Sequence, residues 1–163
     1  MFTAKAKVCG LIANPIGHSM SIALHDCFNW EMGEDLIYVP LQVKEDLKTA
    51  ILGAYSLGIH GMNVTIPYKQ EVIKYLIDID EEARRIGAVN TLVRANGGYI
   101  GKNSDLPGLL MLLEMEGISL QNQDVVLLGE GGAAKSAAYL AGQEGAKSLT
   151  IVNRSRLAAE MLK

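Results

Sequence analysis

The sequence has few cysteines, and they form no redox or metal motif. Its 163 residues include two, Cys9 and Cys27, with no CxxC pair and no neighbouring histidine cluster at metal-ligand spacing. This argues against a disulfide framework, and no metal site is expected. Both cysteines lie in apolar runs, so we expect buried free thiols in a reducing compartment.

Long apolar segments and charge runs are also lacking. No stretch approaches the ~18 apolar residues of a membrane span. The apolar run over 8–13 is too short for the core of a signal peptide. The net charge of −3 argues against nucleic acid or an anionic membrane as the main partner. The sequence therefore predicts a cytoplasmic protein.

Strand-like and helix-like segments alternate along most of the chain. Strands separated by helices predict an α/β fold with a parallel or mixed sheet covered on both faces. The predicted strands are 7–12, 36–42, 60–66, 88–94, 99–102, 125–128 and 148–152. The predicted helices are 21–31, 46–56, 68–77, 81–86, 106–116 and 133–143.

The pattern divides the chain into two domains of unequal completeness. Residues 1–105 have the elements of a whole α/β domain, in which 96–98 form a strong hairpin turn. Residues 106–163 hold a single βαβ unit, which cannot cover a sheet by itself. We therefore expect a truncated second domain, whose unpaired sheet edge invites association.

The segment 61–69 carries the clearest chemical signal. Side chains alternate along a strand, so Asn63 and Thr65 are expected on one face. Pro67 stops the ladder, and Lys69 follows at the start of a predicted helix. Two hydrogen-bonding groups and an amine would then converge on a polyol or hydroxy acid. An ordinary strand–proline–helix junction with a solvated lysine explains these nine residues equally well.

A glycine turn follows the strand at 125–128 and opens the next helix. Gly129, Gly131, Gly132 and Ala133 fit the dinucleotide pattern G-x-G-x-x-A, with its strand–turn–helix context. The helix N-terminus would bind a pyrophosphate. Glu130 within the turn opposes this unless its carboxylate points to solvent.

The next strand ends where a ribose-reading residue belongs. In NAD-binding units this residue is acidic. Here the strand is followed by two guanidinium groups and two short polar side chains, which suit a 2′-phosphate and favour NADP. These are Asn153, Arg154, Ser155 and Arg156. A polar loop without a ligand is the alternative.

Five motifs in a fixed order make the chain resemble the shikimate dehydrogenase family over all its 163 residues. They are 14–21 (Asn-Pro-Ile-Gly-His-Ser-Met-Ser), 61–69, 87–91 (Gly-Ala-Val-Asn-Thr), 103–108 (Asn-Ser-Asp-Leu-Pro-Gly), and 129–136 together with 153–155. The resemblance implies a substrate-binding catalytic domain over 1–105 and a partial Rossmann-type NADP domain over 106–163. It also implies the family reaction, an NADP-dependent hydride transfer that interconverts 3-dehydroshikimate and shikimate in aromatic amino acid biosynthesis.

The resemblance also assigns roles to residues. Ser19 and Ser21 would bind the substrate carboxylate, with Asn63, Thr65 and Asn90 around the ring hydroxyls. Lys69 and Asp105 would be the catalytic pair. Reduction of a ketone leaves an alkoxide, which an ammonium can protonate and stabilise while a carboxylate orients it. Glu81 would lie near the cofactor.

Other interpretations remain open at this stage. Ser19 and Ser21 could be helix N-caps, and Asp105 could cap the helix that it precedes. Because family members are longer, we expect the chain alone to be inactive or impaired. The alternatives are a quinate/shikimate dehydrogenase using NAD, a non-catalytic shikimate-binding module and a purely structural fragment.

Overall fold

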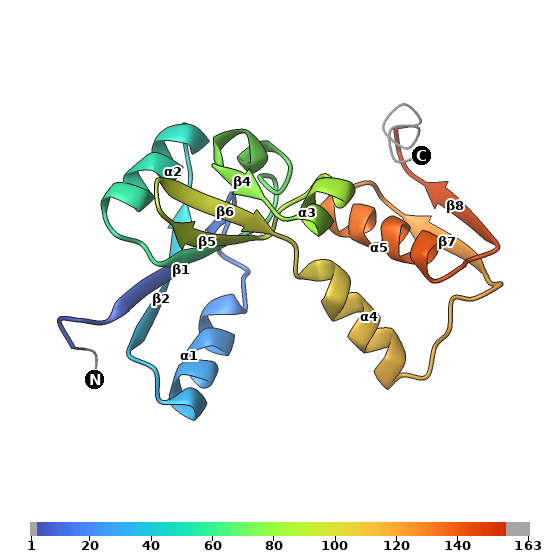
Figure 1. The fold of residues 1–163 in the computed structure, drawn as a ribbon, viewed down its shortest axis with the longest axis horizontal. Coiled ribbons are helices and arrows are strands. Elements are labelled where there is room, and N and C mark those ends of the chain that lie inside the picture. The colour runs from blue at the N-terminus through green and yellow to red at the C-terminus, as the bar shows by residue number, and fades with distance from the viewer. Residues whose placement is uncertain (1–2, 156–163) are drawn as a thin grey trace. The chain divides into compact units, whose positions relative to one another are not determined.

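The computed structural model describes residues 3–155, which form two compact units (Figure 1). The first unit runs to Glu81 and also includes Val89–Lys102. The second unit takes Glu82–Ala88 and the described residues from Asn103 onward. Within residues 3–155, no helix has both the length and the apolar character needed to cross a membrane.

The strands and helices alternate as the sequence predicts. The strands are β1 (Lys7–Ala13), β2 (Leu36–Gln42), β3 (Gly61–Val64), β4 (Asp78–Ile79), β5 (Thr91–Ala95), β6 (Gly98–Lys102), β7 (Asp124–Leu128) and β8 (Ser148–Val152). The helices are α1 (Ser21–Met32), α2 (Leu47–Ser56), the 3₁₀ helix η1 (Glu71–Tyr75), α3 (Glu81–Ile86), α4 (Asp105–Met115) and α5 (Gly132–Gln143).

The first unit is built on a mixed six-stranded sheet in the order β2-β1-β3-β5-β6-β4. Strand β1 pairs in parallel with β2 and β3, whereas β5 is antiparallel to both β3 and β6. The carboxyl ends of β1, β2 and β3 therefore lie at the same edge. The predicted mixed sheet is confirmed.

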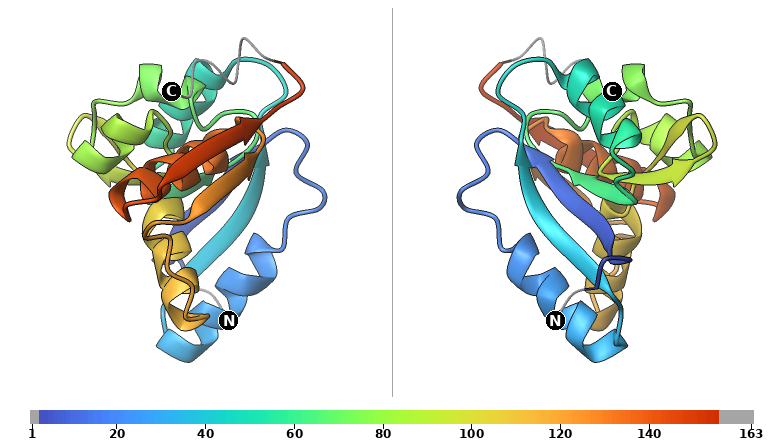
Figure 2. Two further views of the ribbon diagram at one scale, coloured as in Figure 1. Left: turned by 90° about the vertical axis from the view of Figure 1, so that its right-hand side faces the viewer. Right: turned by 90° about the vertical axis from the view of Figure 1, so that its left-hand side faces the viewer.

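Helices cover both faces of this sheet, as the alternation of side chains requires. Ile12 and Met62 face α2 and line a pocket with its residue Ala54. Tyr38, which lies on the opposite face, stacks against His25 of α1. Figures 1 and 2 show α1 and α2 on opposite sides of the strands.

The predicted helix over 68–77 is wrong. Only Glu71–Tyr75 is helical, as a 3₁₀ turn, and the chain then enters β4, which pairs with β6. Glycines on β6 explain the difference, because they leave room for side chains from this segment. A Cβ on Gly98 would meet Ile77 at 2.7 Å, and one on Gly101 would meet Leu76 at 2.6 Å.

Two predicted strands are shorter than expected. The strand predicted over 60–66 ends at Val64, and that over 88–94 begins at Thr91. The residues that flank them make isolated hydrogen bonds to other segments instead of a regular ladder.

The prediction of two buried thiols is wrong. Cys27 is exposed on α1, and Cys9 is half-buried. Helix α1 buries none of its residues fully.

The predicted hairpin is confirmed between β5 and β6. Ala95 pairs with Gly98, which leaves a two-residue turn. Gly97 has a φ of +92°, in the region that favours glycine. The turn residue therefore satisfies a local backbone requirement that the sequence already expresses.

The second unit contains the βαβ unit β7–α5–β8, with its two strands parallel. Its core joins α3, α4 and α5 and consists of Ile86, Ala88, Leu106 and Leu140. One face of the two-stranded sheet is exposed, with Leu128 76% accessible. The α/β fold class is confirmed in both units.

Helix α2 allows a test of the fold by pH. Asp46 caps it, accepting a 2.7 Å hydrogen bond from the Thr49 backbone N–H. Hydrogen bonds from Thr49 hold the pKa of the Asp46 carboxyl below its usual value. The stabilisation of the folded state by the Asp46 carboxylate is therefore fully present above the pKa of the unfolded state. It is lost as the pH falls through the lowered folded-state pKa.

We accordingly expect Asp46→Ala to lower the melting temperature at pH 7 and to have a smaller effect in acid. Thermal unfolding of both proteins between pH 2.5 and pH 7 measures this. Asp46→Asn is the matched control, because it keeps an acceptor without a titrating group. A difference between wild type and Asp46→Ala that is constant across this range would contradict the prediction.

Candidate active site

Two of the predicted site segments meet where the parallel strands β1 and β3 end. Asn14, directly after β1, donates its N–H to the Ile66 carbonyl at 3.1 Å. Thr65 N–H donates to the Ile12 carbonyl at 3.0 Å. The loop leading to the two serines therefore leaves the sheet beside 63–66. Ligands of α/β proteins bind at such carboxyl edges.

The third segment, around Asn90, lies beside 63–69, directly before the antiparallel strand β5. The Asn90 carbonyl accepts a 2.8 Å bond from Val64 N–H, and the Lys69 carbonyl accepts a 2.7 Å bond from Val89 N–H. The Asn90 side chain is buried, and its Oδ1 accepts from Thr91 Oγ1 at 2.9 Å. Lys69 is half-buried in a turn before η1, not in the predicted helix.

The two serine hydroxyls point at one another. Ser19 Oγ donates to Ser21 Oγ at 3.0 Å and accepts from Ser21 N–H at 3.1 Å. The residue before α1 is Met20, whose side chain makes no capping hydrogen bond. Ser19 Oγ instead accepts the N–H of the first helical residue, so the capping alternative holds for Ser19, whereas Ser21 lies within the helix. The paired hydroxyls form a polar turn that can donate to an anionic group.

Asp105 is not the N-cap of α4. It is the first helical residue, and its N–H donates to Asn103 Oδ1 at 2.9 Å. Leu106 N–H donates to the same oxygen at 3.2 Å, and Ser136 Oγ does so at 3.4 Å. Asn103 Nδ2 donates to the Ala88 carbonyl at 2.9 Å. The capping role that the sequence allowed for Asp105 belongs to the buried Asn103.

Lys69 lies in the first unit and Asp105 in the second. Their action as one catalytic pair stays a prediction. The position of Glu81 near the cofactor also stays a prediction. Glu81 begins α3 and is exposed.

The structure adds a residue that the sequence analysis missed. Tyr38 Oη donates to Asn63 Oδ1 at 2.7 Å, across β1. No local pattern marks this tyrosine, because the contact depends on the pairing of three strands. The order of strands would have been needed to find it.

The glycine turn of the second unit fits the phosphates of a dinucleotide. Gly129 has a φ of +104°, and its N–H donates to the Val152 carbonyl at the end of β8. Gly131 precedes α5 without a side-chain cap, and a Cβ there would meet no atom within 4 Å. Open space at an uncapped helix N-terminus suits a pyrophosphate. Glu130 in this turn is half-buried.

The residues predicted to read the ribose follow β8. Asn153 Nδ2 donates to the Ser155 carbonyl at 3.0 Å, which shapes the loop. Arg154 is exposed. Arg156 lies outside the described residues. The described part therefore offers one guanidinium beside a short polar turn.

Comparison with known families decides what this arrangement belongs to. Residues 11–92 match the family model of the shikimate dehydrogenase substrate binding domain, which is half of the chain. The chain belongs to the shikimate dehydrogenase family. The matched range contains both serines and the whole 61–69 segment, and it ends just beyond Asn90.

Individual shikimate dehydrogenases agree with this assignment. The chain is 44% identical over 163 residues to the shikimate dehydrogenase (NADP(+)) of Methanothermobacter thermautotrophicus, covering 99% of this chain and 57% of the relative. A crystal structure of a shikimate dehydrogenase in complex with NADP+ is 42% identical, with a TM-score of 0.92 and coverage of 99% and 56%. The Aquifex aeolicus enzyme is 33% identical, with a TM-score of 0.94 and coverage of 99% and 61%. The chain thus spans little more than half the length of the shikimate dehydrogenases it matches.

Proposed function

We propose that this chain is the substrate-binding and partial cofactor-binding part of an NADP-dependent shikimate dehydrogenase. The observation that carries the proposal is the meeting of Asn14, 63–69 and 89–90 at one sheet edge, within the matched family domain. We retain the domain division 1–105 and 106–163, a cytoplasmic location and a role in aromatic amino acid biosynthesis as parts of this proposal. Association through the exposed strands β7 and β8 is a further part.

The polar groups of the first unit suit a hydroxylated ring acid. Ser19 and Ser21 have hydroxyls 3.0 Å apart that can turn their protons toward a carboxylate. Asn63, Thr65 and Asn90 supply neutral donors and acceptors for ring hydroxyls. Neutral groups of this kind fix orientation without competing for a proton.

Lys69 and Asp105 are proposed to handle the proton. The reaction that converts a ketone to an alcohol leaves negative charge on oxygen, which an ammonium at Lys69 would stabilise and protonate. Asp105 would keep the ammonium oriented and protonated. NADP, held by the glycine turn at 129–132 and by Arg154, would supply or accept the hydride.

The choice between NADP and NAD gives a prediction at Arg154. A guanidinium pairs with a 2′-phosphate but not with a 2′-hydroxyl. We expect Arg154→Gln to weaken NADP binding about tenfold and to leave NAD binding within about twofold. Titration of both nucleotides against both proteins measures this. Lys147→Gln, at an exposed salt bridge to Asp124, is the control. Equal loss for both nucleotides would contradict the role of Arg154.

The function itself is tested by two measurements on the 163-residue protein. Calorimetric titration with shikimate tests the first unit, and NADP reduction in the presence of shikimate tests the whole reaction. Binding without turnover is expected of the 163-residue chain by itself, and only if it persists in a chain completed with the C-terminal part of a relative would it favour the non-catalytic module over the enzyme. Failure to bind shikimate would reject the proposal and favour a purely structural fragment. Faster turnover with quinate and NAD would favour the quinate/shikimate alternative.

A further inference from the structure

We infer that Tyr38 is a positioning residue of this site, whose hydroxyl holds the Asn63 amide so that its NH₂ group faces the ligand. The inference rests on the proposed function and adds to it. It specifies that the ligand must present an oxygen acceptor, and not a donor, to Asn63.

The hydrogen bond fixes which end of the amide is available. Tyr38 Oη donates to Asn63 Oδ1 at 2.7 Å. The tyrosine is only 5% exposed, whereas Asn63 is half-buried. Rotation of the amide by 180° would turn Nδ2 toward the hydroxyl, which would then accept the hydrogen bond instead of donating it. In the orientation that the structure shows, the tyrosine occupies Oδ1, so Nδ2 is the group left for a ligand.

The strand register explains how the tyrosine reaches so far. Tyr38 pairs with Cys9, and Cys9 pairs with Gly61 on the other side of β1. These three residues therefore form one row across β2, β1 and β3. Asn63 lies two residues beyond Gly61 and on the same face.

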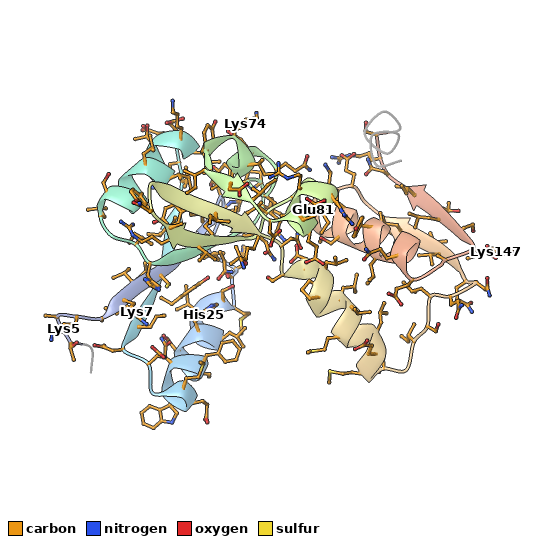
Figure 3. All side chains as sticks on the ribbon, viewed as in Figure 1. Lys5, Lys7, His25, Lys74, Glu81 and Lys147 are labelled. Atoms are coloured by element: carbon orange, nitrogen blue, oxygen red, sulfur yellow. The ribbon has the colours of Figure 1, made fainter. Side chains whose placement is uncertain are left out.

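The tyrosine ring is itself held from α1. The ring of His25 stacks on it with centroids 3.7 Å apart and planes 11° apart. His25 Nδ1 lies 2.8 Å from the carbonyl oxygen of Ser21, one of the two proposed carboxylate-binding serines. Figure 3 shows His25 on α1. A continuous set of contacts thus joins the serine turn to the Asn63 amide through two rings.

The hydroxyl stays a donor over the whole range in which the protein would work. Burial raises the pKa of Tyr38 to about 12, with a smaller effect from Cys9. The phenol therefore keeps its proton at neutral and mildly alkaline pH.

The experiment is a double-mutant cycle measured by calorimetric titration with shikimate. Tyr38→Phe keeps the ring and the stack on His25 but removes the hydroxyl. We expect it to weaken shikimate binding about tenfold. If Tyr38 acts through Asn63, the double variant Tyr38→Phe/Asn63→Ala binds no more weakly than Asn63→Ala alone. Additive losses would overturn the inference, because the tyrosine would then act by another route.

Tyr99→Phe is the matched control. Tyr99 is 1% exposed, and its hydroxyl also donates a 2.7 Å bond, to the Ile59 carbonyl. Ile59 is not among the proposed site residues. We expect the control to lose stability comparably to Tyr38→Phe and to retain shikimate binding within twofold. A similar loss of binding in the control would assign the effect of Tyr38→Phe to stability and overturn the inference.

A second variant keeps the test decisive if Tyr38→Phe does not fold. Asn63→Asp retains an acceptor for the tyrosine but has no NH₂ group, so it is expected to lose at least tenfold in affinity. Wild-type affinity in Asn63→Asp would overturn the inference. A wild-type protein that does not bind shikimate would reject the proposed function and this inference together. A wild type that binds beside an unaffected Tyr38→Phe would reject this inference alone.

Discussion

Replacing Lys69 with alanine is expected to reduce turnover about 10³-fold and to leave shikimate affinity within a few-fold of wild type. The side chain is proposed to act on charge that develops only as the ketone is reduced. Its loss therefore removes stabilisation of the transition state rather than of the bound ground state. Initial rates of NADP reduction give kcat, and calorimetric titration gives the dissociation constant of shikimate.

This measurement needs an active protein. If the 163-residue chain shows no turnover, the assay can use a chimera completed with the C-terminal part of the Methanothermobacter relative, of which this chain covers 57%. Lys74→Ala, on η1 and labelled in Figure 3, is the control for loss of a nearby lysine and is expected to keep full activity. A parallel loss of affinity and rate at Lys69 would make the residue a substrate contact without a role in proton transfer.

Replacing Asn103 with alanine is expected to destabilise the second unit by roughly 3–5 kcal/mol. The side chain is 3% exposed and serves one acceptor and three donors. Its removal leaves the Ala88 carbonyl and the N–H groups of Asp105 and Leu106 without that partner inside the core. Each buried group so affected costs about 1–3 kcal/mol. Hydrogen exchange in α4 and α5 measures the loss.

Gln143→Ala provides a matched amide deletion in the same unit. Gln143 is exposed, and within residues 3–155 its Nε2 donates only to Tyr139 Oη, at 3.0 Å. We expect this control to cost less than about 0.5 kcal/mol. Similar exchange rates in the two variants would mean that the bonds of Asn103 are replaced by water. They would also mean that Asp105 does not depend on Asn103 for its position.

Local chemistry accounts for what the sequence predicted well. The hairpin between β5 and β6 was predictable because Gly97 meets a backbone requirement within four residues. The βαβ unit was predictable because the apolar strands flanking α5 and the glycine turn before it are contiguous in sequence. The polar segments of the candidate site were recognised in the same way, since each motif is short.

Long-range packing accounts for what the sequence did not reveal. The local sequence of 68–77 predicts a helix. In the structure, the glycines of β6 leave room for Leu76 and Ile77 to pack against the sheet instead. The local sequence makes Asp105 a candidate helix cap. In the structure Asn103, whose side chain is bonded to the Ala88 carbonyl, caps the helix instead. Tyr38 carried no signal at all, because its contact with Asn63 exists only once three strands are in register.

The glycines of β6 also limit how this sequence can drift over evolutionary time. A Cβ at Gly98 would lie 2.7 Å from the Ile77 Cγ2, and one at Gly101 would lie 2.6 Å from the Leu76 Cδ1, so a larger residue at either position requires a neighbouring side chain to move. Gly53 on α2 has no atom within 4 Å of the same point, so a Cβ there meets no clash. Which residues fit at these two positions of β6 therefore depends on a segment more than twenty residues earlier in the chain.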